Sequence, residues 1–162
     1  MRTFNVNDYI KFAQRFVEEH YQIDFSIPIK RNNRLSASLG RFVYSNRGAS
    51  HIDLAGFLLV YGDPTVVIDV LKHECIHYAL YEQGLPHEDG NPLFEAELKK
   101  HHVSSTFTRK VGKYMIFKCS QCHKRGETRN NRLIKRPQNY LSTCCKGRLL
   151  LVEEKIYDGT HM

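Results

Sequence analysis

The amino-acid sequence predicts an α+β fold, in which a small antiparallel sheet packs on one central helix and a β-rich region follows at the C-terminus. Helical periodicity with a start and a stop signal over residues 63–84 predicts the central helix. Two short β-rich segments before it predict the sheet. Two pairs of cysteines in the last third of the chain, Cys119 with Cys122 and Cys144 with Cys145, predict a separate small unit that they hold together.

Three helices are predicted from apolar periodicity and capping residues. Residues 7–8 (Asn-Asp) are candidate N-caps of a first helix that ends near residue 20. Asp63 followed by Pro64 starts the central helix, because Asp is a good N-cap and Pro at the first helical position loses no hydrogen bond. Gly84 is a plausible stop. The same start signal recurs at residues 91–92 (Asn-Pro) for a short helix.

Strands are predicted from short apolar segments bounded by turn residues. Residues 41–45 (RFVYS) and 51–60 (HIDLAGFLLV) predict two strands around a glycine-containing turn. The segment 26–34 is polar and is interrupted by Pro28. Residues 105–118 and 145–152 look strand-like and flank a basic, loop-rich stretch.

The composition excludes several classes of protein. Hydrophobic residues make up 41% and charged residues 25%, which is ordinary for a globular chain and unlike a disordered one. No apolar run approaches the ~18 residues of a membrane span, and the first residues lack the apolar core of a secretory signal. Five cysteines, an odd number, do not suggest a secreted disulfide framework. We therefore expect a cytoplasmic protein in a reducing compartment, with no membrane partner.

Charge divides the chain unevenly. Residues 1–100 carry 11 Lys/Arg against 13 Asp/Glu, whereas residues 101–162 carry 13 against 4. We therefore place a boundary near residue 104, between an N-terminal domain (1–104) and a basic domain (105–162). A basic block of this kind is typical of proteins that bind nucleic acid or another polyanion, although it also occurs as a solvated face.

The most specific motif is His73-Glu74-Cys75-Ile76-His77, inside the predicted central helix. The two histidines are one helical turn apart, so both imidazoles can bind one Zn²⁺ ion, and Glu74 lies where a carboxylate can take a proton from the metal's water. The less specific alternative is two surface histidines on an amphipathic helix. Cys75, between the histidines, is expected to pack as a small buried hydrophobic residue.

A catalytic zinc needs a third protein ligand, and the sequence offers three candidates. We favour His87, because imidazole is a good zinc donor and the ten residues after His77 are short enough for a loop to return. Asp89 is the second candidate. Glu97 is the third, because it stands 20 residues after His77, as in thermolysin-type enzymes.

The four C-terminal cysteines predict a structural zinc site. Cys119-x-x-Cys122 is a zinc knuckle, in which a tight turn directs two thiolates at one metal, and a second pair about 20 residues later completes a zinc ribbon. The second pair, Cys144 and Cys145, is adjacent rather than spaced by two residues. Cys144 is the expected fourth ligand, with His123 or water as alternatives, and a reduced hairpin without metal as the less specific interpretation.

Together these motifs resemble the SprT/Spartan family of DNA-associated zinc metalloproteases over nearly the whole chain. The matching parts are the N-terminal helix and three segments: LGRFVYSNRGASHIDLAGFLLVYG, VVIDVLKHECIHYALYEQGLPHEDGNPLFEAEL and KCSQC…CCKGRLLL. The resemblance implies that His73 and His77 bind a catalytic zinc, that Glu74 is the general base, and that the substrates are proteins bound or crosslinked to DNA.

The resemblance bears differently on the third ligand. The family's third histidine usually stands four or five residues before an aromatic residue. Counted back from Phe94, these positions are Gly90 and Asp89, whereas His87 lies seven residues back. The third ligand is therefore open between His87 and Asp89.

The basic stretch between the two cysteine pairs is the predicted DNA-binding surface. Phosphate contacts there would make binding depend on salt and little on sequence. Nearby aromatic residues would favour single-stranded or distorted DNA by stacking on bases, unless they form the small core of the ribbon. The basic residues are Lys124, Arg125, Arg129, Arg132, Lys135 and Arg136, and the aromatic residues are Tyr114, Phe117 and Tyr140.

Two other functions compete with the peptidase. One is a non-catalytic nucleic-acid-binding protein whose HExxH zinc is structural or vestigial, although a structural site has no use for Glu74. The other is a zinc hydrolase with a non-peptide substrate. For the peptidase, we expect the strand near His51–Leu54 to align an extended substrate by edge pairing.

Overall fold

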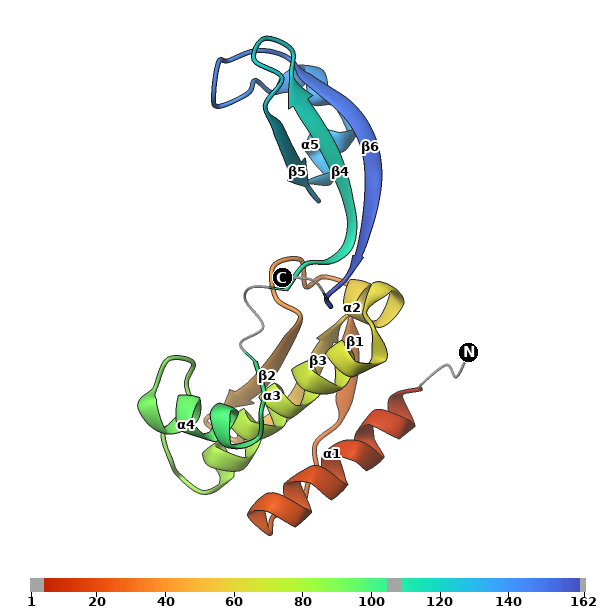
Figure 1. The fold of residues 1–162 in the computed structure, drawn as a ribbon. Helices are drawn as coiled ribbons and strands as arrows, with labels where there is room; N and C mark the ends of the chain where they lie inside the picture. Colours follow the sequence, from red (N-terminus) through yellow and green to blue (C-terminus); the bar gives the residue numbers. More distant parts are fainter. Residues whose placement is uncertain (1–4, 105–108, 161–162) are drawn as a thin grey trace.

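A computed structural model describes residues 5–104 and 109–160. It confirms a mixed α+β fold built around two three-stranded sheets. Figure 1 shows two lobes, one above the other: an N-terminal lobe that carries the first sheet and most helices, and a slender C-terminal lobe formed by the second sheet. No helix in these two ranges combines the length and the apolar character that crossing a membrane requires.

The N-terminal lobe contains a mixed sheet, not the purely antiparallel one that the sequence predicts. Its strands are β1 (Ile29–Asn32), β2 (Gly40–Ser45) and β3 (Gly48–Ala55), in the order β1-β3-β2. β2 runs antiparallel to β3, as expected, but β1 pairs with β3 in parallel. β1 lies in the polar segment 26–34, for which the sequence predicts no strand. Only Ile29 of its four residues is buried, so no alternation marks the strand.

The second predicted strand is shorter than expected. β3 ends at Ala55, and the apolar run GFLLVY becomes the helix α2 (Gly56–Tyr61). Periodicity cannot separate a strand from a buried helix in such a short apolar run. The turn from strand to helix places α2 at the end of the lobe that faces the C-terminal sheet (Figure 1).

Two of the three predicted helices begin at their predicted caps. α3 (Pro64–Glu82) begins after Asp63, whose carboxylate accepts from the Thr65 N–H, and α4 (Pro92–Lys100) begins after Asn91 in the same way. α1 (Val6–Tyr21) starts earlier than the Asn-Asp pair at 7–8 suggests. Its N-cap is Asn5, which forms a reciprocal capping box with Asp8.

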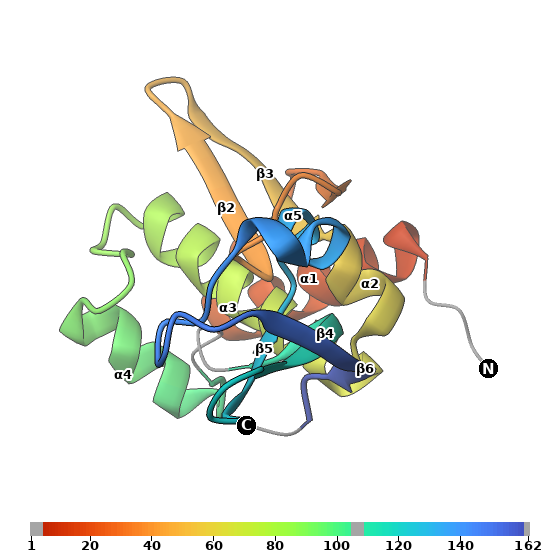
Figure 2. The ribbon, with the colours of Figure 1, turned by 90° about the horizontal axis from the view of Figure 1, so that it is seen from above.

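α3 is the centre of the N-terminal lobe. It packs against α1, α4 and β2, and its buried residues include apolar side chains together with His73, Glu74 and His77. Seen from above, the far end of the β2–β3 hairpin projects beyond the helices (Figure 2). The HExxH motif therefore lies inside the lobe, on a helix that packs against several other elements.

The C-terminal lobe is a three-stranded antiparallel sheet in the order β5-β4-β6. The predicted strands are present as β4 (Val111–Cys119) and β6 (Leu149–Asp158), although residues 105–108 lie outside the described residues. The stretch expected to be loop-rich also contains β5 (Arg125–Thr128), α5 (Asn131–Lys135) and the 3₁₀ helix η2 (Pro137–Asn139).

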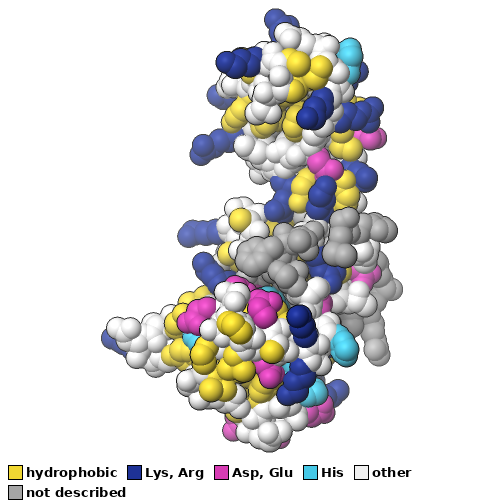
Figure 3. Space-filling view, turned by 60° about the vertical axis from the view of Figure 1, so that its left-hand side comes forward, with side chains coloured by type: hydrophobic (Ala, Val, Ile, Leu, Met, Phe, Trp, Pro, Cys, Tyr) yellow, Lys and Arg dark blue, Asp and Glu magenta, His cyan; other side chains and the backbone are white. Residues whose placement is uncertain are grey.

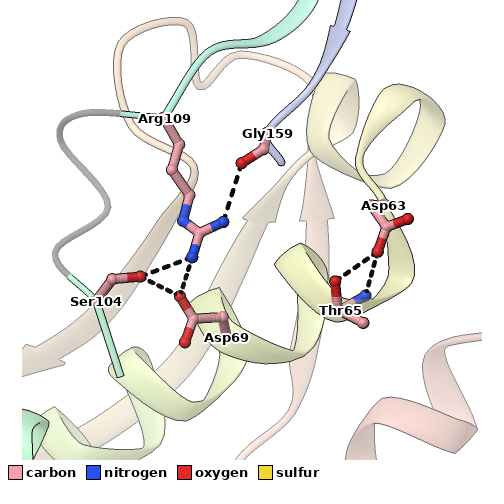
Figure 4. A network of polar contacts seen from close by, with 6 residues as sticks. All are labelled: Asp63, Thr65, Asp69, Ser104, Arg109 and Gly159. Carbon is pink, nitrogen blue, oxygen red and sulfur yellow. Dashed lines mark hydrogen bonds and ion pairs between the residues drawn. The ribbon is translucent and has the colours of Figure 1, made fainter. Parts of the chain in front are cut away.

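The two lobes join where the C-terminal sheet begins and ends. Arg109 donates to the Asp69 carboxylate of α3 at 2.9 Å, to the Ser104 hydroxyl at 2.7 Å and to the Gly159 carbonyl at 2.9 Å (Figure 4). Val111, at the start of β4, is buried in the main core. The chain therefore enters and leaves this sheet at points anchored to the helix that carries the HExxH motif.

Candidate metal centres

A cleft of about 280 Å³ opens over α3 in the N-terminal lobe. Three segments line it: β2 with the loop before it, the HExxH part of α3, and residues 87–89 that follow α3. Its wall residues come from both sides of the motif, so a ligand in the cleft would lie directly above His73, Glu74 and His77.

Two imidazoles and one carboxylate meet in this cleft. His73 Nε2 lies 3.1 Å from Asp89 Oδ1, and His77 Nε2 lies 3.4 Å from the same oxygen. The two histidines are buried, whereas the Asp89 side chain is half exposed. The helix therefore presents a fixed pair of donors, and the loop after it adds a third donor from the open side.

These distances fit a metal ion. Zinc bonds of ~2.0–2.1 Å in tetrahedral geometry place neighbouring donor atoms about 3.3 Å apart. The observed separations of 3.1 and 3.4 Å agree with this value. His73, His77 and Asp89 thus form a group that could bind a metal ion.

Neighbouring groups orient both imidazoles. His77 Nδ1 donates to the His87 carbonyl oxygen, which leaves the Nε2 lone pair facing Asp89. The Phe94 ring, fully buried, stacks on His77 at 4.0 Å and meets His73 edge-on at 5.2 Å. Burial lowers the pKa of His77 to about 4, so its ring is neutral at pH 7, as metal binding requires.

His87, which the sequence favours as the third donor, does not reach the two motif histidines with its side chain. Its ring packs against Phe42, Tyr44 and Tyr81, and only its backbone carbonyl reaches His77. Glu97 does not join them either, because its carboxylate accepts from the Tyr21 hydroxyl at 2.7 Å. The geometry supports Asp89, which lies five residues before Phe94, in agreement with the spacing from that aromatic residue.

Glu74 lies beside the metal-binding group, at the bottom of the cleft. The Phe42 backbone N–H of β2 donates to its carboxylate, and a Cβ built on Gly40 would lie only 3.1 Å from its Oε1 atom. Burial raises the pKa of Glu74 to about 8, and the negative charge of the Asp89 carboxylate is the second cause of this increase. Glu74 therefore lies where a carboxyl group could exchange a proton with a water molecule in the cleft.

The strand that borders the cleft is β2, not the segment His51–Leu54. That segment belongs to β3, which lies between β1 and β2 and therefore has no free edge. Within the described residues, β2 pairs with no strand other than β3, and Gly40, Arg41, Phe42 and Tyr44 line the cleft. The prediction of an edge strand beside the site thus applies to a different strand.

The four C-terminal cysteines form a second group that could bind a metal ion. Their sulfur atoms all lie within 4.8 Å of one another, and Cys122 Sγ is 3.4 Å from Cys144 Sγ. Zinc–sulfur bonds of ~2.3 Å imply sulfur atoms about 3.8 Å apart. The adjacent pair Cys144 and Cys145 contributes both of its thiols, and His123 does not belong to the group.

Ser142 supports this group without being part of it. It occupies the position where a knuckle would place another cysteine, and its hydroxyl lies 3.2 Å from Cys119 Sγ and accepts from the Gly147 N–H. The contact with Ser142 is the largest cause of a lowered pKa of Cys119, which falls to about 6. Backbone N–H groups, including that of Gln121, lower it further. A thiol that ionises readily is a better metal ligand.

The predicted DNA-binding residues do not all lie on one surface. Arg132, Lys135 and Arg136 line a hollow together with Asn139 and Tyr140. Lys124 and Arg125 border a second hollow that includes Phe117 and Tyr140. Figure 3 shows Lys and Arg side chains spread over the upper lobe, with hydrophobic side chains between them.

The side chains of Arg129, Tyr114 and Phe117 make contacts within the molecule. The Arg129 guanidinium donates to the Ser36 and Val111 carbonyl oxygens and lies over the rings of Phe57 and Tyr114. Phe117 packs on Gly126, where an added Cβ would lie 2.6 Å from its ring. No pattern in the sequence indicates this role for Arg129, because it depends on contact between the two lobes.

Comparison with known proteins shows which family this chain resembles. The SprT-like family profile matches residues 6–110. A "Protein SprT-like" from Bacillus cereus is 30% identical over 149 residues, which cover 84% of this chain and 91% of that protein. Others from Streptococcus mutans and Streptococcus gordonii are each 25% identical, over 90% and 93% of this chain and 95% and 99% of theirs. The profile spans more than half of the sequence and includes the whole HExxH centre, so the chain belongs to the SprT-like family.

Proposed function

We propose that this protein is a zinc-dependent endopeptidase that cleaves proteins bound or crosslinked to DNA. The observation that carries the proposal is the buried Glu74 carboxylate beside the His73–His77–Asp89 group, at the bottom of a cleft bordered by the edge of β2 opposite β3. A structural metal site needs neither a buried acid beside its ligands nor an open cleft above them.

The residues of the cleft would divide the reaction among them. His73, His77 and Asp89 would bind zinc, which polarises a scissile carbonyl and acidifies the attacking water. The Glu74 carboxylate would take the proton of that water and pass it to the leaving amine. The edge of β2 opposite β3, apart from the Phe42 N–H that donates to Glu74, would pair with an extended substrate chain through backbone hydrogen bonds.

The proposed link to DNA rests on the C-terminal lobe. Its cysteine group would bind a structural zinc, which would hold the basic hollow of Arg132, Lys135 and Arg136 in place. Tyr140 lies in the same hollow and offers a ring on which an unpaired base could stack. A single-stranded or distorted DNA would supply both phosphates and exposed bases to this surface.

The deciding experiment replaces Glu74 by Gln. The variant should keep both zinc ions but lose cleavage of an unfolded protein, added with single-stranded DNA, by at least the ~10²–10⁴-fold typical of a missing general base. Glu82→Gln is the matched control, because Glu82 is exposed at the end of the same helix.

Each outcome separates the candidate functions. Undiminished cleavage by Glu74→Gln would contradict the proposed mechanism. A wild-type protein that binds zinc and DNA but cleaves nothing would favour the non-catalytic nucleic-acid-binding protein. Cleavage of an ester or another non-peptide substrate alone would favour a different hydrolase.

A further inference from the structure

Arg129 connects three elements at the junction of the lobes. It follows β5 directly, and its guanidinium lies 4.2 Å from the ring centre of Phe57 in α2 and 5.4 Å from that of Tyr114 in β4. One terminal nitrogen donates to the Ser36 carbonyl oxygen at 2.6 Å, and the other donates to the Val111 carbonyl oxygen at 3.3 Å. A side chain of the C-terminal lobe thus binds the backbone of the N-terminal lobe.

The hydrogen bond to Ser36 matters because the next four residues of the chain form one wall of the metal-binding cleft. These residues are Ala37, Ser38, Leu39 and Gly40. Leu39 is buried, and its carbonyl oxygen accepts from the Ala55 N–H, so this end of the loop is fixed to the sheet. Residues 36–38 are exposed.

Arg129 is the main polar anchor at the other end of this loop. Within residues 5–104 and 109–160, no other side chain donates a hydrogen bond to the backbone of residues 35–39. The stacked rings hold the flat guanidinium in one plane, and its fixed fork directs one N–H group at Ser36. A lysine ammonium has neither the plane nor the fork.

We propose that Arg129 is a positioning residue of the cleft, which holds the Ala37–Gly40 wall against the substrate, and not a phosphate-binding residue of the DNA surface. The inference rests on the proposed peptidase activity. It means that the C-terminal lobe shapes substrate binding in the N-terminal lobe through one side chain.

The test compares Arg129→Gln and Arg129→Lys with Arg148→Gln. Arg148 lies in the same lobe and is exposed, and within the described ranges its side chain makes no hydrogen bond or ion pair, so the control removes the same charge and leaves the loop anchor intact. In cleavage of an unfolded protein, Arg129→Gln should raise KM about 3- to 10-fold, the size of one net hydrogen bond, while kcat stays within about twofold. Arg129→Lys should restore little of this loss.

Amide hydrogen exchange provides a readout that does not require catalysis. Peptides that contain residues 36–40 should exchange faster in Arg129→Gln than in the wild type or in Arg148→Gln, while peptides from α3 stay unchanged. Phe57→Leu, which removes the ring beneath the guanidinium but keeps its charge, should shift KM and exchange in the same direction. This variant keeps the inference testable if Arg129→Gln does not fold.

Two results would overturn the inference. The first is equal KM and equal exchange in Arg129→Gln and Arg148→Gln. The second is an Arg129→Gln protein with an unchanged cleft but a smaller salt dependence of single-stranded DNA binding, which would make Arg129 a phosphate-binding residue. If the wild type cleaves no protein, the proposed function fails, whereas the exchange experiment still decides whether Arg129 holds the loop.

Discussion

Three residues form the group in the cleft that could bind a metal ion. The imidazoles of His73 and His77 are fixed by burial and by the ring of Phe94, whereas Asp89 reaches them from the loop that follows α3. His87, two residues earlier, contributes only its backbone carbonyl. The structure thus places Asp89, and not the predicted His87, beside the two histidines. These two positions are therefore the most informative ones to mutate.

Asp89→Ala should lower the zinc affinity of the HExxH centre by more than the ~10- to 100-fold loss typical of changes around a metal's ligands. The reason is that a carboxylate donor 3.1 Å from His73 Nε2 is removed. His87→Ala should leave the affinity nearly unchanged, because the carbonyl that orients His77 remains. Competition with a chromophoric chelator measures both, and the opposite order of effects would restore His87 as the ligand.

At the level of secondary-structure elements, capping residues contribute much to the placement of the site. α3 carries the motif, and its first turn is fixed by Asp63, whose carboxylate accepts from both the N–H and the hydroxyl of Thr65 (Figure 4). Pro64 at the first helical position starts the helix without losing a hydrogen bond. The start of α3 sets the angular position of every residue after it, including the two histidines.

Asp63→Ala should reduce the free energy of unfolding by about 1 kcal/mol, the usual cost of removing an N-cap. Urea unfolding followed by circular dichroism measures this loss. Asn91→Ala, the equivalent change at α4, is expected to cost a similar amount. A loss well below about 0.5 kcal/mol in both variants would show that packing, not capping, fixes these helix starts.

The elements that sequence analysis predicts well are those with strong local signals. The caps at Asp63 and Asn91 and the strand at 41–45 depend on neighbouring residues only, and the structure confirms them. β1 has no such signal, because it forms by parallel pairing with a strand some twenty residues away. The apolar run after Ala55 fits a strand as well as a helix, so tertiary packing decides it.

In the candidate site, too, features with a local sequence signal could be predicted and features that depend on tertiary packing could not. The spacing of His73 and His77 is a property of one helix and could be predicted. The choice of Asp89 over His87 depends on the path of the loop between α3 and α4, and the role of Arg129 depends on how two lobes meet, so neither follows from local sequence. A basic residue in a basic segment predicts binding to a polyanion. Only the contacts of Arg129 show that it binds the N-terminal lobe instead.

At the scale of the whole molecule, one ion pair links the C-terminal sheet to α3. Arg109 and Asp69 are both largely buried, and Asp69 lies one turn before His73 on the same helix. Arg109→Gln should therefore destabilise the protein by about 1–3 kcal/mol, the range for a hydrogen bond to a charged group and for the penalty of leaving its partner unsatisfied. Calorimetry measures the loss, and Lys110→Gln, which removes a more exposed ion pair with Glu127, is the comparison.

The charge of the C-terminal lobe leads to a separate prediction. Replacing Arg132, Lys135 and Arg136 together by Gln should weaken single-stranded DNA binding and reduce the salt slope by about 0.7 for each phosphate that these side chains neutralise in the wild type. Zinc content should stay at the wild-type value, because these residues are not part of the cysteine group. Anisotropy titrations at several salt concentrations decide it, and equal slopes would mean that the hollow is a solvated face.

The C-terminal lobe leaves and rejoins the rest of the chain at nearly the same place. Val111 at the start of β4 is paired with Asp158 at the end of β6, and Arg109 binds the Gly159 carbonyl. A cut in the outer segment, between Cys122 and Cys144, would therefore yield two fragments that stay paired along β4 and β6. Such a nicked protein would run as two bands on a denaturing gel and as one particle in solution, so loss of full-length chain would not by itself mean loss of the lobe.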